Sequence, residues 1–150
     1  FKDGQDLEAR AHMMSAAAMG ATAFQKGLGA IHSLSHPISS VYDAHHGLAN
    51  AVFMPHVITF NKPVIKDKLK IISSYLSLKS AGYTGVIDWV LELCDIFDIP
   101  NNPEKIGARP KDVNKLAIMA ANDPTATGNP IPVGPKEMRE LYQKSFEGSF

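Results

Sequence analysis

The chain has 150 residues, of which 45% are apolar and 20% are charged, values that suit one globular domain with a sizeable core and exclude a disordered tail. Fifteen basic residues balance fifteen acidic ones, so there is no basic field to collect phosphates, and we expect neither a nucleic acid nor a membrane as a partner. The single cysteine, Cys94, excludes an internal disulfide and a thiolate metal site, and no apolar run reaches the roughly 20 residues that span a bilayer. These features are typical of a cytoplasmic protein.

The first predicted element is a helix from about Leu7 to Gln25. Turn residues at positions 3–6 precede it and supply an N-cap, after which apolar residues recur near helical spacing. The many alanines and methionines of this segment predict a helix that is buried against its neighbours. Gly27 and Gly29 are expected to end it.

Prolines punctuate the rest of the chain. A short second helix is predicted from Gly29 to Ser35, because Pro37 disfavours a helical conformation at the residue before it. A third helix is predicted to begin at His46, and Pro55 is expected to kink or end it. Further helices are predicted at 67–78, 84–97, 111–122 and 135–146, with a Pro-rich surface connection at 122–135. No stretch alternates at period two, so the predicted fold class is all-α, a multi-helix bundle.

Four of the six histidines fall in a short stretch, at His32, His36, His45 and His46. Imidazole is a common ligand of divalent metals and also titrates near neutral pH. His32 and His36 are four residues apart, a spacing that places both rings on one face of a helix. The loop after Pro37 can fold His46 back against His32, and bundles commonly build metal sites from side chains on facing helices.

Other interpretations of these residues stay open. A packed or solvated pair is the ordinary alternative for the first two histidines taken by themselves. Two imidazoles also do not complete a catalytic metal site, which generally has three or more protein ligands. Asp43 is close enough in sequence to contribute, but it serves equally well as a helix cap. We expect His45 to face solvent, and His12 and His56 to be structural or exposed.

Two stretches match a known signature: GLGAIHSLSHP at 27–37 and YDAHHGLANAVFMPH at 42–56. They closely resemble the signature of the iron-containing (group III) alcohol dehydrogenases, in which a histidine, a His-Pro pair and a His-Gly-x-Ala-Asn string follow one another at fixed spacing. The spacings from His32 to His36 to His46 agree with that signature without a gap.

The resemblance extends upstream to the segment 3–10 and downstream to Asn129-Pro130. It therefore covers nearly the whole chain, but only the C-terminal part of the family's sequence. Two positions depart from the family pattern. His45 stands where a proline commonly precedes the next histidine, and Ile131 replaces the arginine that often follows Asn-Pro, which leaves any role of that arginine without a counterpart here.

The resemblance implies roles for three histidines. His32 and His46 would be metal ligands, while His36 would be a catalytic residue that lines the same cleft as a proton-relay partner. The metal would be Fe²⁺, with Zn²⁺ in some members, and its other ligands would come from a segment before Phe1. The resemblance also implies that residues 1–150 are the C-terminal helical domain of a dehydroquinate synthase-like fold, without the N-terminal dinucleotide-binding domain that binds NAD or NADP.

The implied function is that of a metal-dependent alcohol dehydrogenase, which transfers hydride between a primary alcohol, or the aldehyde, and NAD(P) while the metal polarises the substrate oxygen. The chain by itself is expected to be inactive. Its expected partners are a small alcohol or aldehyde, the missing N-terminal domain and, as an option that the sequence leaves open, a second copy in a homo-oligomer.

The competing hypothesis is a non-catalytic helical binding or assembly module, in which the histidines pack and cap helices. The abundant methionines and alanines on predicted helix faces, which could dock a partner, motivate it. A zinc hydrolase is weaker, because no glutamate lies beside the histidine pair to act as the base of a His-Glu-x-x-His helix.

Overall fold

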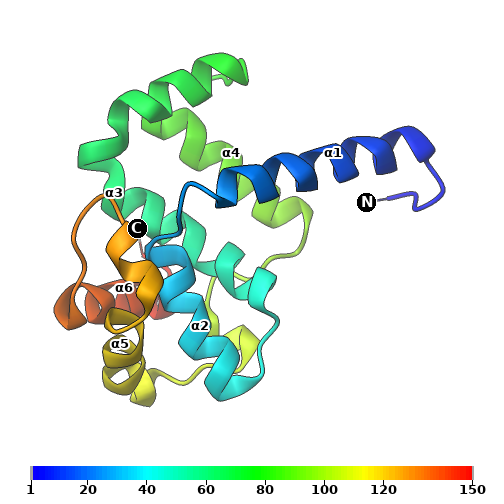
Figure 1. Ribbon diagram of the computed structural model, residues 1–150. Helices are drawn as coiled ribbons and strands as arrows, with labels where there is room; N and C mark the ends of the chain where they lie inside the picture. The colour runs from blue at the N-terminus through cyan, green and yellow to red at the C-terminus, as the bar shows by residue number, and fades with distance from the viewer. Residues whose placement is uncertain (1, 150) are drawn as a thin grey trace.

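The computed structural model of the chain describes residues 2–149, and all regular secondary structure within them is helical. Figure 1 shows the arrangement of the helices. They are α1 (Leu7–Phe24), α2 (Ala30–Tyr42), α3 (His46–Tyr75), α4 (Gly82–Ile96), α5 (Val113–Ala121) and α6 (Pro135–Glu147), with short 3-10 helices at Pro103–Ile106, Pro110–Asp112 and Pro124–Gly128. The predicted all-α class is confirmed. Over the described residues, no helix combines the length and the apolar character that crossing a bilayer requires.

The main core forms where α2, α3, α5 and α6 meet. α2 packs against α3 and α5, and α5 packs against α6. Leu34 and Ile38 of α2, Phe53 of α3 and Leu116 of α5 are fully buried there. Tyr142 of α6 meets the Phe53 ring edge-on and donates its hydroxyl proton to the Leu34 carbonyl oxygen at 2.6 Å. This packing fixes α2 relative to α3, the two helices that carry the clustered histidines.

A second, smaller core joins α4 to the distal half of α3. Leu69 of α3 is buried together with Val86 and Val90 of α4. The N-terminus of α4 is tied to α3 by a hydrogen bond of 2.7 Å, in which the Gly82 N–H donates to the Ser73 hydroxyl oxygen. The distal half of α3 therefore has its own partner and does not depend on α2 for burial.

The predicted end of the second helix is wrong, and of the two outcomes expected at Pro55, a kink or an end, the end does not occur. α2 continues through Pro37, where we predicted an end at Ser35, and α3 continues through Pro55 and Pro63 and absorbs the separate helix predicted at 67–78. An internal proline costs a helix about 3 kcal/mol or more. The burial of Pro37 and Pro55 with their apolar neighbours outweighs that cost. Figure 1 shows that α3 bends along its length, the usual consequence of internal prolines.

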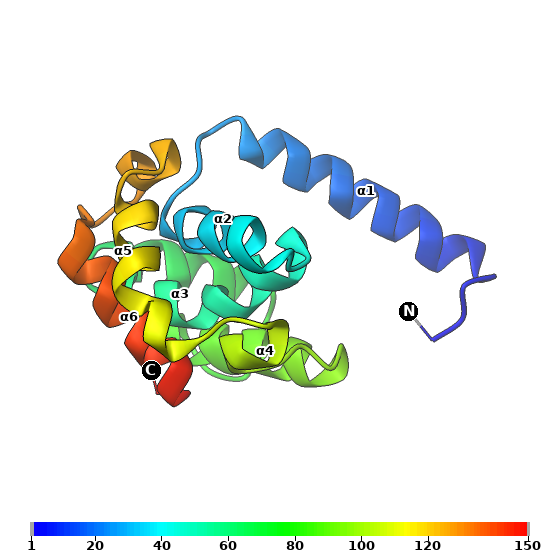
Figure 2. The same cartoon turned by 90° about the horizontal axis from the view of Figure 1, so that it is seen from below.

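α1 forms as predicted but is not buried as predicted. The Asp6 side chain accepts a hydrogen bond of 3.0 Å from the Ala9 N–H and so caps the helix start. None of the residues of α1 is buried, and Met13 and Met14 are 65% and 75% exposed. Figure 1 and Figure 2 both show α1 extending away from the packed helices. Its Ala and Met content makes an apolar helix, but the described residues do not cover it.

The connection at 122–135 runs along the surface as predicted, with many exposed residues, but it is anchored to the fold at the buried Ala126 and Asn129. Asn129 is buried, and its Oδ1 accepts a hydrogen bond of 3.2 Å from the Ala30 N–H at the start of α2. Asn129 and Asn61 of α3 exchange a reciprocal pair of amide hydrogen bonds, each of 2.9 Å. The connection therefore links the start of α2 to α3 through Asn129. These hydrogen bonds also pair the buried amide groups, which would be costly to leave unpaired.

We predict that Gly128→Ala destabilises the protein. A Cβ at this position would lie 1.9 Å from the Leu28 carbonyl oxygen, so the backbone would have to move apart. The free energy of unfolding, measured by urea denaturation, should fall by about 1–3 kcal/mol, the usual cost of overpacking.

Gly20→Ala is the matched control, because nothing lies within 4 Å of a Cβ added at that position of α1. This variant should keep the wild-type stability or gain up to about 1 kcal/mol. If Gly128→Ala unfolds at the same urea concentration as the wild type, the close approach of the two segments is not present in solution.

Candidate metal centre

Three of the predicted histidines meet where α2 and α3 begin. The ring centroids lie 5.9 Å apart for His32 and His36, 5.3 Å for His32 and His46, and 5.2 Å for His36 and His46. The prediction that the loop folds His46 back against His32 is confirmed. His32 and His36 are half-buried and His46 is exposed, so the cluster lies at the surface of this chain.

Asn50 lies between His32 and His46. Its Nδ2 is 3.3 Å from Nε2 of His32 and 3.0 Å from Nε2 of His46. An amide NH₂ group only donates hydrogen bonds, so both Nε2 atoms act as acceptors and both rings carry their proton on Nδ1. The Ser35 hydroxyl donates to Asn50 Oδ1 at 2.5 Å, which sets the end of the amide that faces the rings. The two Nε2 lone pairs therefore converge on one point.

The surroundings of His32 favour its neutral form. Burial lowers the pKa of His32, and the neighbouring His46 and His36 lower it further, against a smaller opposing effect of Asp123. The Phe24 ring packs edge-on against His32 with a centroid distance of 5.6 Å and adds apolar surface. A neutral imidazole is the form that can ligate a metal, and these surroundings favour that form of His32.

His36 has a different partner. Its Nδ1 lies 2.7 Å from Oδ2 of Asp123, in the connection after α5. Oδ1 of the same carboxylate accepts from the Thr125 backbone N–H at 2.8 Å and from the Thr125 hydroxyl at 2.5 Å. Burial alone would raise the pKa of Asp123, but the bonds from Thr125 and His36 outweigh burial and hold this pKa below its usual range. A shallow cavity of about 220 Å³ borders both His36 and Asp123.

The other candidates have structural contacts of their own. His45 is the N-cap of α3, because its Nδ1 accepts from the Leu48 N–H at 3.2 Å. Asp43 ends α2 in the left-handed conformation, with φ at 53°. His12 is exposed on α1 and lies 3.7 Å from Glu8. Across residues 2–149, no three His, Cys, Asp or Glu side chains are arranged to hold a metal ion by themselves.

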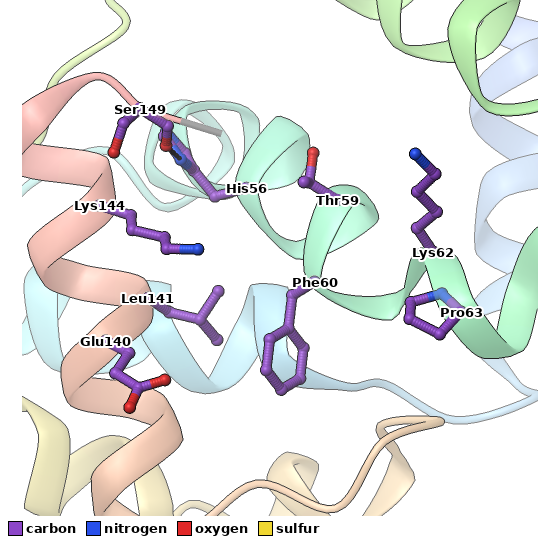
Figure 3. A pocket seen from close by; sticks show the side chains of 9 residues that line it. All are labelled: His56, Thr59, Phe60, Lys62, Pro63, Glu140, Leu141, Lys144 and Ser149. Atoms are coloured by element: carbon purple, nitrogen blue, oxygen red, sulfur yellow. Dashed lines mark hydrogen bonds between the residues drawn. The ribbon is translucent and has the colours of Figure 1, made fainter.

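A separate cavity of about 290 Å³ lies between α3 and α6, and the three clustered histidines do not line it. Figure 3 shows Leu141 pointing across it toward Phe60, with Lys144 at one side. His56 borders this cavity, is 3% exposed and donates from Nδ1 to the Ser149 carbonyl oxygen at 3.1 Å. The contact with Ser149 gives His56 a structural role near the C-terminal end, one of the two roles expected for it.

The sequence reasoning missed the polar partners of the cluster. Asn50 lies four residues after His46, and this helical spacing could have placed the amide beside that ring. Asp123 is 87 residues from His36 along the chain. Its Asp-Pro-Thr context predicts only a helix cap, a role that Asp123 also fills for the 3-10 helix Pro124–Gly128. No local pattern could have paired it with a histidine.

Known proteins are similar to this chain over nearly its whole length. The model of the "Fe-containing alcohol dehydrogenase family, C-terminal" matches residues 1–146. A 4-hydroxybutyrate dehydrogenase of Cupriavidus necator is 33% identical over 96% of this chain and 40% of its own length. An NAD-dependent methanol dehydrogenase of Bacillus methanolicus is 32% identical over 85% of this chain and 35% of its own length. This chain therefore spans less than half the length of these relatives.

The fold has a counterpart among solved structures. An alcohol dehydrogenase from Oenococcus oeni superposes with a TM-score of 0.88 over 96% of this chain and 39% of its own, at 24% identity. At this identity the likeness concerns the fold alone, and the superposition covers nearly the whole of this chain.

We predict that the free energy of unfolding falls as the pH is lowered from about 7.5 to 5. Burial lowers the pKa of His56, and the nearby Lys144 charge lowers it further, against the effect of the hydrogen bond to Ser149. The pKa of His56 in the unfolded chain is about 6.5, so His56 binds a proton more readily in the unfolded chain than in the folded one. The contribution of His56 is complete above that pKa and is lost as the pH falls below it.

His56→Asn isolates this effect, because an amide keeps a donor for the Ser149 carbonyl but does not titrate. Urea denaturation across the same pH range should show a smaller loss of stability in the variant than in the wild type. Parallel pH dependences of the two proteins would contradict the assignment to His56.

Proposed function

Because the chain belongs to the Fe-containing alcohol dehydrogenase family, we propose that it is the helical, metal-binding part of an alcohol dehydrogenase, with His32 and His46 as two of the metal ligands. The convergence of their Nε2 lone pairs on the Asn50 amide is the observation that carries this proposal. The metal is Fe²⁺, with Zn²⁺ as the alternative, and imidazole nitrogen suits both ions. NAD or NADP takes up or gives the hydride.

The residues fit a divalent ion in their chemistry. Two neutral imidazoles face one point, and the carboxylate near the cluster, Asp123, is engaged by His36 and Thr125 rather than left as an unpaired charge. The ion, when bound, supplies a Lewis acid that polarises the substrate oxygen. Asn50, held by its bond to Ser35, turns both Nε2 atoms toward its own amide nitrogen, and an ion bound by both rings would take the place of that amide.

His36 is the proposed catalytic residue. It lies against both proposed ligands, with ring centroids 5.9 Å from His32 and 5.2 Å from His46. Oxidation of an alcohol releases the hydroxyl proton, and a histidine within reach can accept it as a general base. With Nδ1 bonded to Asp123, Nε2 is the atom that accepts this proton and passes it on.

A second domain completes the site in this proposal. Residues 1–150 form the C-terminal helical domain, and an N-terminal dinucleotide-binding domain supplies the nicotinamide cofactor and the remaining metal ligands. The position of the cluster supports this division, because His46 is exposed and a facing domain can cover it. The uncovered apolar side chains of α1 give that domain further surface to pack against.

The substrate class is a small primary alcohol or its aldehyde. The relatives are named for 4-hydroxybutyrate and methanol, which share a primary hydroxyl group and differ in length and charge. The common requirement is an oxygen that the ion can polarise next to a carbon that carries the transferable hydride.

A non-catalytic helical module remains the alternative function. The exposed Met13, Met14 and Met19 of α1 favour it, because clustered methionines suit a docking surface. The two functions differ in what they require of the histidines. An assembly module needs no Nε2 lone pairs directed at a common point, whereas the dehydrogenase does.

We predict that His32→Ala and His46→Ala each weaken metal binding. Isothermal titration calorimetry of the chain with Zn²⁺ near neutral pH should show weak binding by the wild type, because a full catalytic site has more ligands than these two. Each variant should bind Zn²⁺ at least about tenfold more weakly, since even the loss of a residue that only hydrogen-bonds to a metal ligand lowers metal affinity by about that factor.

His45→Ser is the matched control. Serine retains a side-chain cap for α3, so this neighbour of His46 can change without loss of the helix start or of metal binding. Wild-type Zn²⁺ affinity in both alanine variants would refute the proposed ligands and favour the assembly module.

We also predict that the 150-residue chain alone does not oxidise alcohols. Incubation with Fe²⁺, NAD⁺ and methanol or 1,3-propanediol should yield no NADH by fluorescence, because the cofactor site and part of the metal ligand set lie outside these residues in the proposed division. NADH production above that of a His32→Ala, His46→Ala double variant would show that the chain is a complete enzyme and would overturn the two-domain proposal.

A further inference from the structure

We propose that Asp123 is a positioning residue that holds the ring proton of His36 on Nδ1 and so makes Nε2 the lone-pair atom of that ring. The proposal deepens the proposed function, on which it rests for the proton that Nε2 would accept. It assigns a role to a residue far from the histidine signature in sequence, in the connection between α5 and α6.

Each oxygen of the Asp123 carboxylate has a separate task. Oδ1 accepts two hydrogen bonds from Thr125, one from its backbone N–H at 2.8 Å and one from its hydroxyl at 2.5 Å. Oδ2 is left for Nδ1 of His36 at 2.7 Å. The Asp123 side chain is 14% exposed, so water competes little for these positions. An ionised carboxylate only accepts hydrogen bonds, and the atom it faces on His36 must therefore carry the proton.

Thr125 holds the carboxylate in place from a second direction. Its hydroxyl oxygen lies 3.0 Å from the Ser33 hydroxyl oxygen, on α2 and one turn before His36. The connection and α2 are thus joined at two points, through Thr125 to Ser33 and through Asp123 to His36. A carboxylate anchored in this way cannot rotate to exchange its two oxygens without breaking several bonds at once.

The cap role of Asp123 does not explain the contact with His36. Capping the 3-10 helix Pro124–Gly128 requires one side-chain oxygen for the Thr125 N–H. An asparagine would serve that purpose equally well. The second oxygen is the part that only aspartate supplies, and it lies against the histidine. A carboxylate that holds an imidazole in one tautomer is also the device that orients the base in hydrolase triads.

The three clustered rings then have their protons set by two independent groups. Asn50 directs Nε2 of His32 and His46 toward one point. Asp123, in the connection after α5, sets the tautomer of His36 through a separate hydrogen bond. A change at Asp123 should therefore alter His36 and leave the aim of the other two rings intact.

Asp123→Asn separates this role from capping. The two Thr125 donors require an acceptor, so they retain the amide oxygen at the position of Oδ1. The amide NH₂ then replaces Oδ2 and faces Nδ1 of His36. Because an NH₂ group only donates, Nδ1 must become an acceptor and the ring proton must move to Nε2. The substitution keeps the shape and the cap but reverses the tautomer.

The experiment is ¹⁵N NMR of the histidine side chains in the full 150-residue chain, with a chelator present and at about pH 8.5, where histidines are neutral. Loss of one set of signals in His36→Gln assigns the His36 resonances. We expect His36 to be predominantly the Nδ1–H tautomer in the wild type and predominantly the Nε2–H tautomer in Asp123→Asn. Asp112→Asn is the control, because that carboxylate accepts from the Tyr42 hydroxyl at 2.7 Å and should leave the His36 tautomer unchanged.

An Nε2–H tautomer in the wild type would overturn the proposal without any variant. A retained Nδ1–H tautomer in folded Asp123→Asn would overturn the role of Asp123. If Asp123→Asn does not fold, Asp123→Leu tests the same point, because an apolar side chain leaves no acceptor and the Nδ1–H preference should be lost. The readout needs neither metal nor turnover, so a failure of the proposed dehydrogenase function would appear in the Zn²⁺ titration and not in this spectrum.

Discussion

The packing of α2 on α3 is the constraint from which the site follows. Leu34 and Ile38 are buried against α3 together with Phe53, and Tyr142 closes this contact from α6. Burial of side chains of this size stabilises the contact by about 1.5–3 kcal/mol each. The starts of α2 and α3 are thereby held beside each other, so that the ring centroids of His32 and His46 lie 5.3 Å apart. The chemistry lies at the surface, but buried apolar residues determine where it lies.

Polar contacts refine what the apolar packing brings together. Ser35 orients Asn50, and Asn50 turns the lone pairs of two histidines toward one position. Thr125 anchors Asp123, and Asp123 holds His36. Each ring is thus fixed in direction as well as in place, the condition under which side chains bind a ligand or move a proton efficiently.

Local sequence patterns were sufficient for several elements and for the meeting of the histidines. The helices at α1, α4, α5 and α6 were predicted within a few residues, because caps, glycines and apolar spacing are local signals. The spacing of His32 and His36 likewise follows from helical geometry alone. A reversal of the chain before His46 was expected, although α2 continues to Tyr42 before it occurs.

The errors arose where tertiary packing decides the outcome. Pro37 and Pro55 do not end their helices, since their burial with apolar neighbours compensates for one lost hydrogen bond in each helix. α1 has the composition of a buried helix and is exposed over its length within the described residues. Asp123 reaches His36 only because α2 and the connection after α5 lie side by side in the folded chain. No periodicity or motif in a single sequence encodes such a contact.

Anomalous diffraction from crystals of the chain soaked with Zn²⁺ tests the central claim most directly. The shared position of the two Nε2 lone pairs predicts one metal peak bonded to Nε2 of both His32 and His46, each at about 2.0–2.1 Å. A metal peak bonded to only one of these rings, or located elsewhere on the chain while Asn50 remains between them, would contradict it.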